Sequence, residues 1–137
     1  MKKIFYLSWF LLYVLNAFTG YFVHHVLLGD KYKAIANALH ADVKSRLWAF
    51  ILISIFGSFF CTFFFSKLKR YHSVNGGVLF GFLVGIWLTT GEYLSAYASS
   101  NAISLSLAVE WIILGIIQYM IAGLVLGLLF SRQKESV

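Results

Sequence analysis

Proline is absent from this 137-residue chain, and there is only one cysteine. Proline is common where transmembrane helices kink or break, so its absence argues against a transporter built on discontinuous helices. The single thiol, Cys61, can neither close an internal disulfide nor supply the paired cysteines of a membrane thiol oxidase. We interpret Cys61 as a small apolar residue at a contact between helices.

Charged residues are also scarce, at 12% of the chain, whereas hydrophobic residues make up 61%. An ordinary soluble domain is about a quarter charged. The net charge of +6 does not indicate a nucleic-acid partner, because the basic residues cluster at the ends of apolar runs, where they meet lipid headgroups. These terminal and connecting residues are Lys2, Lys3, Lys67, Lys69, Arg70, Arg132 and Lys134.

Four apolar runs fill the chain, at residues 4–28, 47–66, 76–98 and 104–130. Each has about the 20 residues that a helix needs to cross a hydrocarbon core of about 30 Å. We therefore predict an all-α integral membrane four-helix bundle that occupies residues 1–137 as a single transmembrane domain. The first run lacks a convincing signal-peptide cleavage site, so we expect it to be retained as a helix.

The connection 29–46 is the only sizeable one, and we expect it to lie at the membrane interface. Ala34–Leu39 is a good helix former, and Asp42 could cap the start of the second span. Seven of the Lys and Arg residues lie at the termini and in the second connection, against four in the first connection. This bias predicts a multi-pass protein with both termini in the cytoplasm.

Small residues recur at helical spacing in three of the runs and predict close packing between helices. Glu92 lies seven residues after Gly85, on the same predicted helix face, so we expect its carboxyl group to point into a helix contact or a cavity. Asn16 lies near mid-membrane and needs a polar partner there. The predicted packing residues are Gly77, Gly81, Gly85, Gly123 and Gly127, with Ser54, Gly57 and Ser58 beside Cys61.

Ionisable residues inside the runs are His24, His25, Glu92 and Glu110. The alternating direction of the helices brings these four to one end of the bundle, with Asn16, Tyr93 and Gln118 as supporting polar residues. Charged groups inside a membrane helix are costly and mark a pathway, a ligand site or a paired network. His40 and His72 are expected to be interfacial or solvated.

Three interpretations of this polar cluster stay open. The carboxyl groups of Glu92 and Glu110 could simply pair with His24, Tyr93, Tyr97 or Trp111 and lock the bundle. They could instead form a proton-linked path, because imidazole and a desolvated carboxyl exchange protons readily. The four side chains could also bind a metal ion, although neighbouring histidines point about 100° apart on a helix and no Glu-x-x-His pair exists.

The segment from Gly20 to Tyr32, the glycine run from Gly76 to Gly85, and Glu110 followed by Gln118 and Gly123–Gly127 resemble a known group of proteins. This group comprises small four-helix bacterial inner-membrane proteins known as a domain of unknown function (the DUF1761-like group). The chain departs from it beside His24 and His25, where an aromatic residue is expected, and after Arg46, where a proline is expected. The resemblance implies the fold and no assigned activity.

We expect a small subunit or accessory partner of a membrane assembly that contacts the lipid bilayer and packs against another copy or another membrane protein. We expect no catalytic residue and no cofactor. Two alternatives are a small proton-coupled transporter or channel that uses Glu92, Glu110 and His24, and a metal-binding membrane enzyme.

Overall fold

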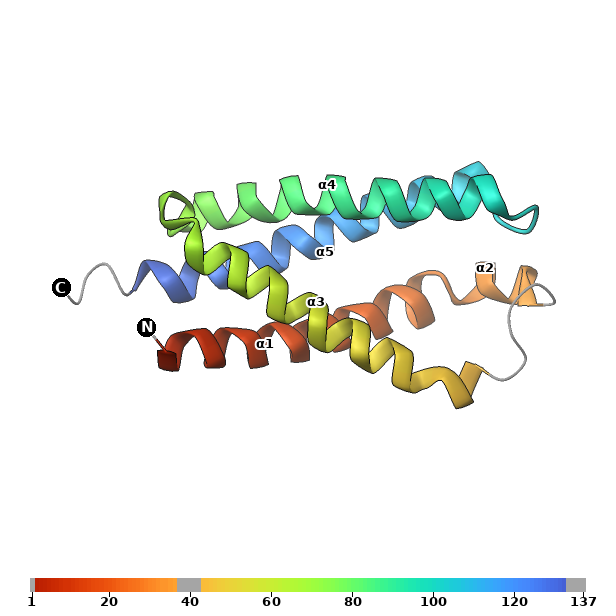
Figure 1. The fold of residues 1–137 in the computed structure, drawn as a ribbon. Coiled ribbons are helices and arrows are strands. Elements are labelled where there is room, and N and C mark those ends of the chain that lie inside the picture. Colours follow the sequence, from red (N-terminus) through yellow and green to blue (C-terminus); the bar gives the residue numbers. More distant parts are fainter. Residues whose placement is uncertain (1, 37–42, 133–137) are drawn as a thin grey trace.

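The computed structural model describes residues 2–36 and 43–132, and helices make up nearly all of this part of the chain (Figure 1). No strand occurs in the described segments. The elements, in chain order, are α1 (Lys2–Tyr21), the π-helix η1 (Phe22–Leu27), α2 (Gly29–Ala34), the 3₁₀ turn η3 (Val43–Arg46), α3 (Leu47–Lys67), the 3₁₀ turn η4 (Lys69–Tyr71), α4 (Val74–Ser99) and α5 (Leu105–Ser131).

Four of the described segments are long and apolar enough to cross a membrane: Lys3–Leu27, Leu47–Lys67, Val74–Ser99 and Leu105–Ser131. Their ends match the predicted apolar runs to within two residues. The four-helix, all-α prediction is thus confirmed, and the architecture is compatible with a multi-pass membrane protein. The start of α1 and the end of α5 lie at one end of the bundle, and α2 lies at the opposite end (Figure 1).

Serine caps determine where the last two long helices begin. The Ser73 side chain accepts a hydrogen bond of 3.0 Å from the backbone N–H of Gly76, which opens α4. The Ser104 side chain accepts one of 3.2 Å from the N–H of Leu107, which opens α5. A cap of this kind satisfies one of the N–H groups that the first turn of a helix leaves free.

Glycines bring α4 and α5 together at backbone distance. A Cβ atom added at Gly77 would collide with the backbone of Gly123, and one at Gly81 would collide with the carbonyl oxygen of Tyr119. At Gly85 it would lie 3.0 Å from the Cα atom of Ile116. These residues, together with Gly127, lie in the contact that the glycine spacing predicts, and α4 and α5 form an antiparallel hairpin.

Helix α1 packs against both α3 and α5. Its contact with α3 includes the ring of Phe59, whose centroid lies 5.8 Å from that of Phe5 and 5.2 Å from that of Trp9, and Ser8, Ser58 and Thr62 on these two helices are all 0% exposed. The Trp9 indole N–H also donates a hydrogen bond of 3.2 Å to the carbonyl oxygen of Ile55. Next to this contact, an apolar cluster closes the termini end of the bundle: Leu12, Phe65, Phe80, Ala122, Leu126 and Phe130.

His72 lies at the edge of this cluster and is half-buried rather than solvated. Its ring centroid is 5.3 Å from that of Phe65 and 4.9 Å from that of Phe130. Its Nε2 atom lies 3.0 Å from the carbonyl oxygen of Phe65. His72 therefore ties the end of α3 to the end of α5.

One detail of the predicted packing needs correction. Gly57 is exposed, and a Cβ atom there would meet nothing within 4 Å, so it does not share the contact made by Ser58. The reason is the oblique course of α3 across the bundle (Figure 1), because the described residues from Leu47 to Gly57 include no buried one. Half-buried Ser54 and Cys61 flank the buried Ser58.

The first connection also differs from its prediction. Its short helix is α2, which spans Gly29–Ala34 and precedes the expected Ala34–Leu39. Most of that expected helix, as well as His40 and Asp42, lies outside the described residues. Helix α3 begins after the turn η3 without a side-chain cap from Arg46.

The α4–α5 contact predicts opposite outcomes for two matched glycine substitutions. Gly81→Ala should lower the free energy of unfolding in detergent by about 1–3 kcal/mol, because the new methyl group forces two backbones apart. Gly57→Ala should leave it unchanged or raise it by up to about 1 kcal/mol, because the site is open and alanine favours a helix. A denaturant titration followed by circular dichroism measures both. Equal effects of the two substitutions would contradict the assigned contact.

Candidate functional site at the α2 end of the bundle

The wide helical turn at the end of the first span sets the geometry of the polar end. In η1 the backbone N–H of Leu28 donates to the carbonyl oxygen of Val23, five residues earlier, at 3.0 Å. Such π-type turns rotate the following residues relative to an α-helix and are frequent at functional sites. Leu28 is buried after this turn, and α2 follows at the same end of the bundle (Figure 1).

Four ring-bearing side chains form a row that connects four elements at this end of the bundle. The Nδ1 atom of His24 lies 2.6 Å from the phenol oxygen of Tyr32. Tyr32 stacks on Trp111 with a centroid distance of 5.9 Å, and Trp111 lies 5.2 Å from the ring of Tyr93. We call His24, Tyr32, Trp111 and Tyr93 the ring layer, and its members come from η1, α2, α5 and α4 in that order.

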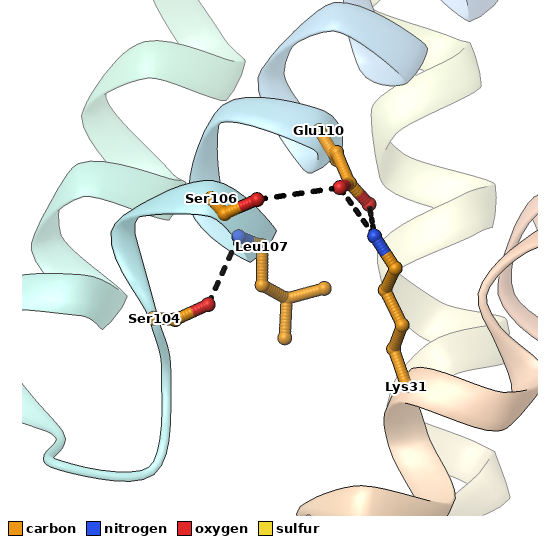
Figure 2. A network of polar contacts seen from close by, with 5 residues as sticks. All are labelled: Lys31, Ser104, Ser106, Leu107 and Glu110. Carbon is orange, nitrogen blue, oxygen red and sulfur yellow. Dashed lines mark hydrogen bonds and ion pairs between the residues drawn. The ribbon is translucent and has the colours of Figure 1, made fainter.

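An ion pair beside the ring layer connects α2 with α5. The Lys31 ammonium group binds both oxygens of the Glu110 carboxylate, and the hydroxyl of Ser106 lies 3.5 Å from one of them (Figure 2). The Lys31 and Glu110 side chains are 47% and 34% exposed. A pair with this exposure stabilises by at most about 1 kcal/mol, so its main effect is to orient α2.

The phenol group of Tyr32 is uncharged at neutral pH. Burial raises the pKa of Tyr32 to about 12, so its phenol group keeps its proton at neutral pH. A neutral phenol can donate its proton to an unprotonated Nδ1 atom, which fits the short distance to His24. On the exposed side of α2, Lys33 lies 2.8 Å from Asp30, and this hydrogen bond lowers the pKa of the Asp30 carboxyl.

The four ionisable residues predicted as a cluster lie near one end of the bundle but do not meet. His24 contacts Tyr32, and Glu110 contacts Lys31. His25 is exposed, with its ring 4.7 Å from that of Tyr21. Within the described residues no three His, Cys, Asp or Glu side chains lie close enough to hold a metal ion, so the candidate metal ligands are not gathered.

Glu92 is exposed on α4, but its carboxyl group is within electrostatic range of the phenol groups of Tyr93 and Tyr119. The buried positions of α4 advance in steps of four from Gly77 to Gly81, Gly85 and Thr89. The next step reaches Tyr93, which packs on Trp111. Because two helices cross at an angle, the line of contact drifts around each of them, and a seven-residue step from Gly85 leaves that line.

The polar contact expected in mid-span for Asn16 is made by another residue. The Gln118 side-chain amide donates a hydrogen bond of 2.7 Å to the hydroxyl of Thr19, which links α5 to α1. Asn16 lies one turn earlier on the same half-buried side of α1. The sequence analysis did not single out Thr19, and it gave Tyr32 no role beyond its place in the interfacial connection.

Two hollows on the described surface are apolar and lie away from the ring layer. One of about 320 Å³ lies between α1 and α5, and its lining residues are Leu11, Val14, Leu15, Phe18 and Val125. Another of about 250 Å³ lies along α4 and α5, lined by Val78, Ile117, Met120, Ile121 and Leu124. Neither offers a polar group to a hydrophilic substrate, and both suit acyl chains or apolar side chains.

Comparison of this chain with protein-family models, with curated proteins and with solved structures finds no match. The functional argument therefore rests on the geometry described above.

The bond between His24 and Tyr32 predicts how firmly α2 is held. Tyr32→Phe keeps the ring stack on Trp111 but removes the hydroxyl, which costs about 1 kcal/mol. Amide hydrogen exchange in Gly29–Ala34 should then become roughly fivefold faster. Tyr21→Phe is the matched control, because Tyr21 is exposed and its ring contacts His25. If exchange in α2 were the same in both variants, the bond would not hold the helix.

Proposed function

We propose that the protein is a small integral membrane subunit or accessory partner, which packs against another membrane protein or another copy of itself. The excess of Lys and Arg residues at the termini and in the second connection favours cytoplasmic termini, so the α2 end would face away from the cytoplasm. The membrane would be a bacterial inner membrane, as for the proteins that the chain resembles. The resemblance to small four-helix inner-membrane proteins of unknown function agrees with this proposal and adds no activity.

The observation that carries the proposal is that Glu92 of α4 is exposed and has no hydrogen bond or ion pair among the described residues. Glu92 lies seven residues before Ser99, where α4 ends, which is about 10 Å along a helix. A helix of 26 residues is about 39 Å long and extends past a hydrocarbon core of about 30 Å at both ends. Centred in the bilayer, α4 would place the Cα atom of Glu92 about 6 Å inside the hydrocarbon.

A carboxyl group at this depth is unfavourable against acyl chains and favourable against protein. A charged residue costs about 2.5–3.5 kcal/mol at the centre of a membrane helix on insertion scales. Among the described residues, no hydrogen bond or ion pair reaches the carboxyl group of Glu92. Gly91 beside it is open, since a Cβ atom there would meet nothing within 4 Å. An adjacent helix from another chain could approach closely here and supply the missing donor.

The transporter alternative has less support from the geometry. A proton-linked path would need His24, Glu92 and Glu110 to share a hydrated route. Instead, His24 pairs with Tyr32, Glu110 pairs with Lys31, and Glu92 is exposed beside the phenol groups of Tyr93 and Tyr119. The two hollows described above are apolar and do not join these groups.

Native mass analysis of the tagged full-length protein, purified from its own membranes in mild detergent, tests the proposal. We expect complexes heavier than the 15.5 kDa chain. Glu92→Gln should weaken them by roughly three- to tenfold, as expected for the loss of a polar contact between membrane helices. Glu110→Gln is the matched control, because Lys31 already satisfies that carboxylate within the chain.

A monodisperse monomer in mild detergent and in lipid nanodiscs would contradict the proposed function. Uptake of protons or of a solute by vesicles that contain this protein alone, abolished by Glu92→Gln and Glu110→Gln, would favour the transporter instead.

A further inference from the structure

One side of α4 is covered by α3 near the termini and uncovered near the α2 end. Four residues lie along this side, each directly before a residue of the contact with α5: Phe80, Val84, Leu88 and Glu92. Phe80 packs on Phe65 of α3 with ring centroids 5.1 Å apart, and it is 6% exposed. Val84 is half-buried, Leu88 is 39% exposed, and Glu92 is exposed. The cover of this side is therefore lost along the second half of α4.

The cover is lost because α3 leaves α4. Figure 1 shows α3 next to the beginning of α4 and increasingly far from it toward the α2 end. No residue of α3 from Leu47 to Gly57 is buried. Helix α4 packs mainly on α5 along its whole length. In the described part of the chain, the side of α4 that α3 covers near the termini has no helix over it at the level of Glu92.

The uncovered side holds a carboxyl group with two phenol groups beside it. Glu92 is within electrostatic range of Tyr93 and of Tyr119 on α5. Among the described residues, none of these three side chains makes a hydrogen bond or an ion pair. A phenol group is uncharged at neutral pH, and its oxygen can accept a hydrogen bond. The site thus combines one acid with two hydroxyl oxygens and contains no cation.

The same side of α4 is shaped for close approach by another helix. Gly91 and Ser95 are exposed and four residues apart, and a Cβ atom at Gly91 would meet nothing within 4 Å. Small residues at this spacing let a second helix come near the backbone of the first. We call the following exposed residues the docking side of α4: Leu88, Gly91, Glu92 and Ser95.

We infer that the docking side of α4 binds a transmembrane helix of a different protein, which places a Lys or Arg side chain beside Glu92. This inference rests on the proposed function and deepens it by naming the kind of partner. The partner helix would cover the second half of α4 as α3 covers the first half.

Charge complementarity argues for a basic residue and for a different protein. A carboxylate and a cation are each costly inside a membrane, and a charge-assisted hydrogen bond between them offsets that cost. The ammonium group of a lysine has three donors, which the carboxylate and the phenol oxygens can accept. All Lys and Arg residues of this chain lie at or beyond the ends of its four spans, so a second copy has none inside a span.

A designed transmembrane peptide tests the inference with the purified protein in lipid vesicles. The peptide is a Leu/Ala helix of about 24 residues with one Lys about two turns from one end, and the matched peptide has Gln there. Energy transfer from a dye on a terminal tag of the protein to a dye on the peptide measures association. We expect the Lys peptide to bind roughly tenfold more tightly than the Gln peptide. Glu92→Gln should remove this difference, and Glu110→Gln should leave it.

Photo-cross-linking in the native membrane gives a second readout. A photoreactive amino acid replaces either Leu88 on the docking side or, as the control, Ile117 on α5. Both positions are exposed and lie at similar levels, because Gly85 packs against Ile116. We expect position 88 to give about fivefold more product, with a transmembrane segment that carries Lys or Arg. Glu92→Lys should lower the product about fivefold, and exchange of the partner's basic residue for Glu should restore it.

Each outcome decides the inference separately from the proposed function. Equal binding of the two peptides, or a difference that survives Glu92→Gln, overturns the inference. A product at position 88 no greater than the control overturns it too, as does one with a second copy or with a helix that lacks a basic residue. In each case a complex heavier than the chain leaves the subunit role standing, whereas a monomer by mass overturns both.

Discussion

The backbone contact between α4 and α5 is the constraint on which the rest of this bundle depends. Inside a bilayer apolar side chains gain little by leaving lipid, so helices associate where small residues let their backbones touch. Gly77, Gly81 and Gly123 provide that approach here, and a methyl group at any of them would collide with the facing backbone. The resulting hairpin positions Trp111 and Glu110 of α5, onto which α2 folds.

The polar end of the bundle is held by contacts from four elements. The row from His24 through Tyr32 and Trp111 to Tyr93 crosses the bundle, and Lys31 binds the carboxylate of Glu110 beside it. This arrangement satisfies one histidine and one acid internally. The contacts of Tyr32 and Lys31 hold α2 at this end of the bundle.

The same arrangement leaves His25 and Glu92 without a hydrogen bond or ion pair among the described residues, and both are exposed. A charged group is unfavourable in lipid and is stabilised by polar neighbours. For Glu92 the phenol groups of Tyr93 and Tyr119 lie within electrostatic range.

Hydropathy alone determined the number, extent and order of the four long helices. This succeeds because a membrane span must satisfy its backbone internally over a length set by the bilayer. The glycine spacing also identified the residues at the α4–α5 contact. Both are local signals, which one segment carries by itself.

Only the tertiary structure decided which polar groups meet. The crossing of α4 and α5 moves the contact from Gly85 to Thr89 and Tyr93, so that Glu92 is exposed beside this contact rather than enclosed in it. The π-helical turn η1 brings Tyr32 and Lys31 to His24 and Glu110, and no periodicity in the sequence indicates this. Crossing angles and returning turns depend on several segments at once, so the sequence by itself determined the helices, whereas their packing decided the site.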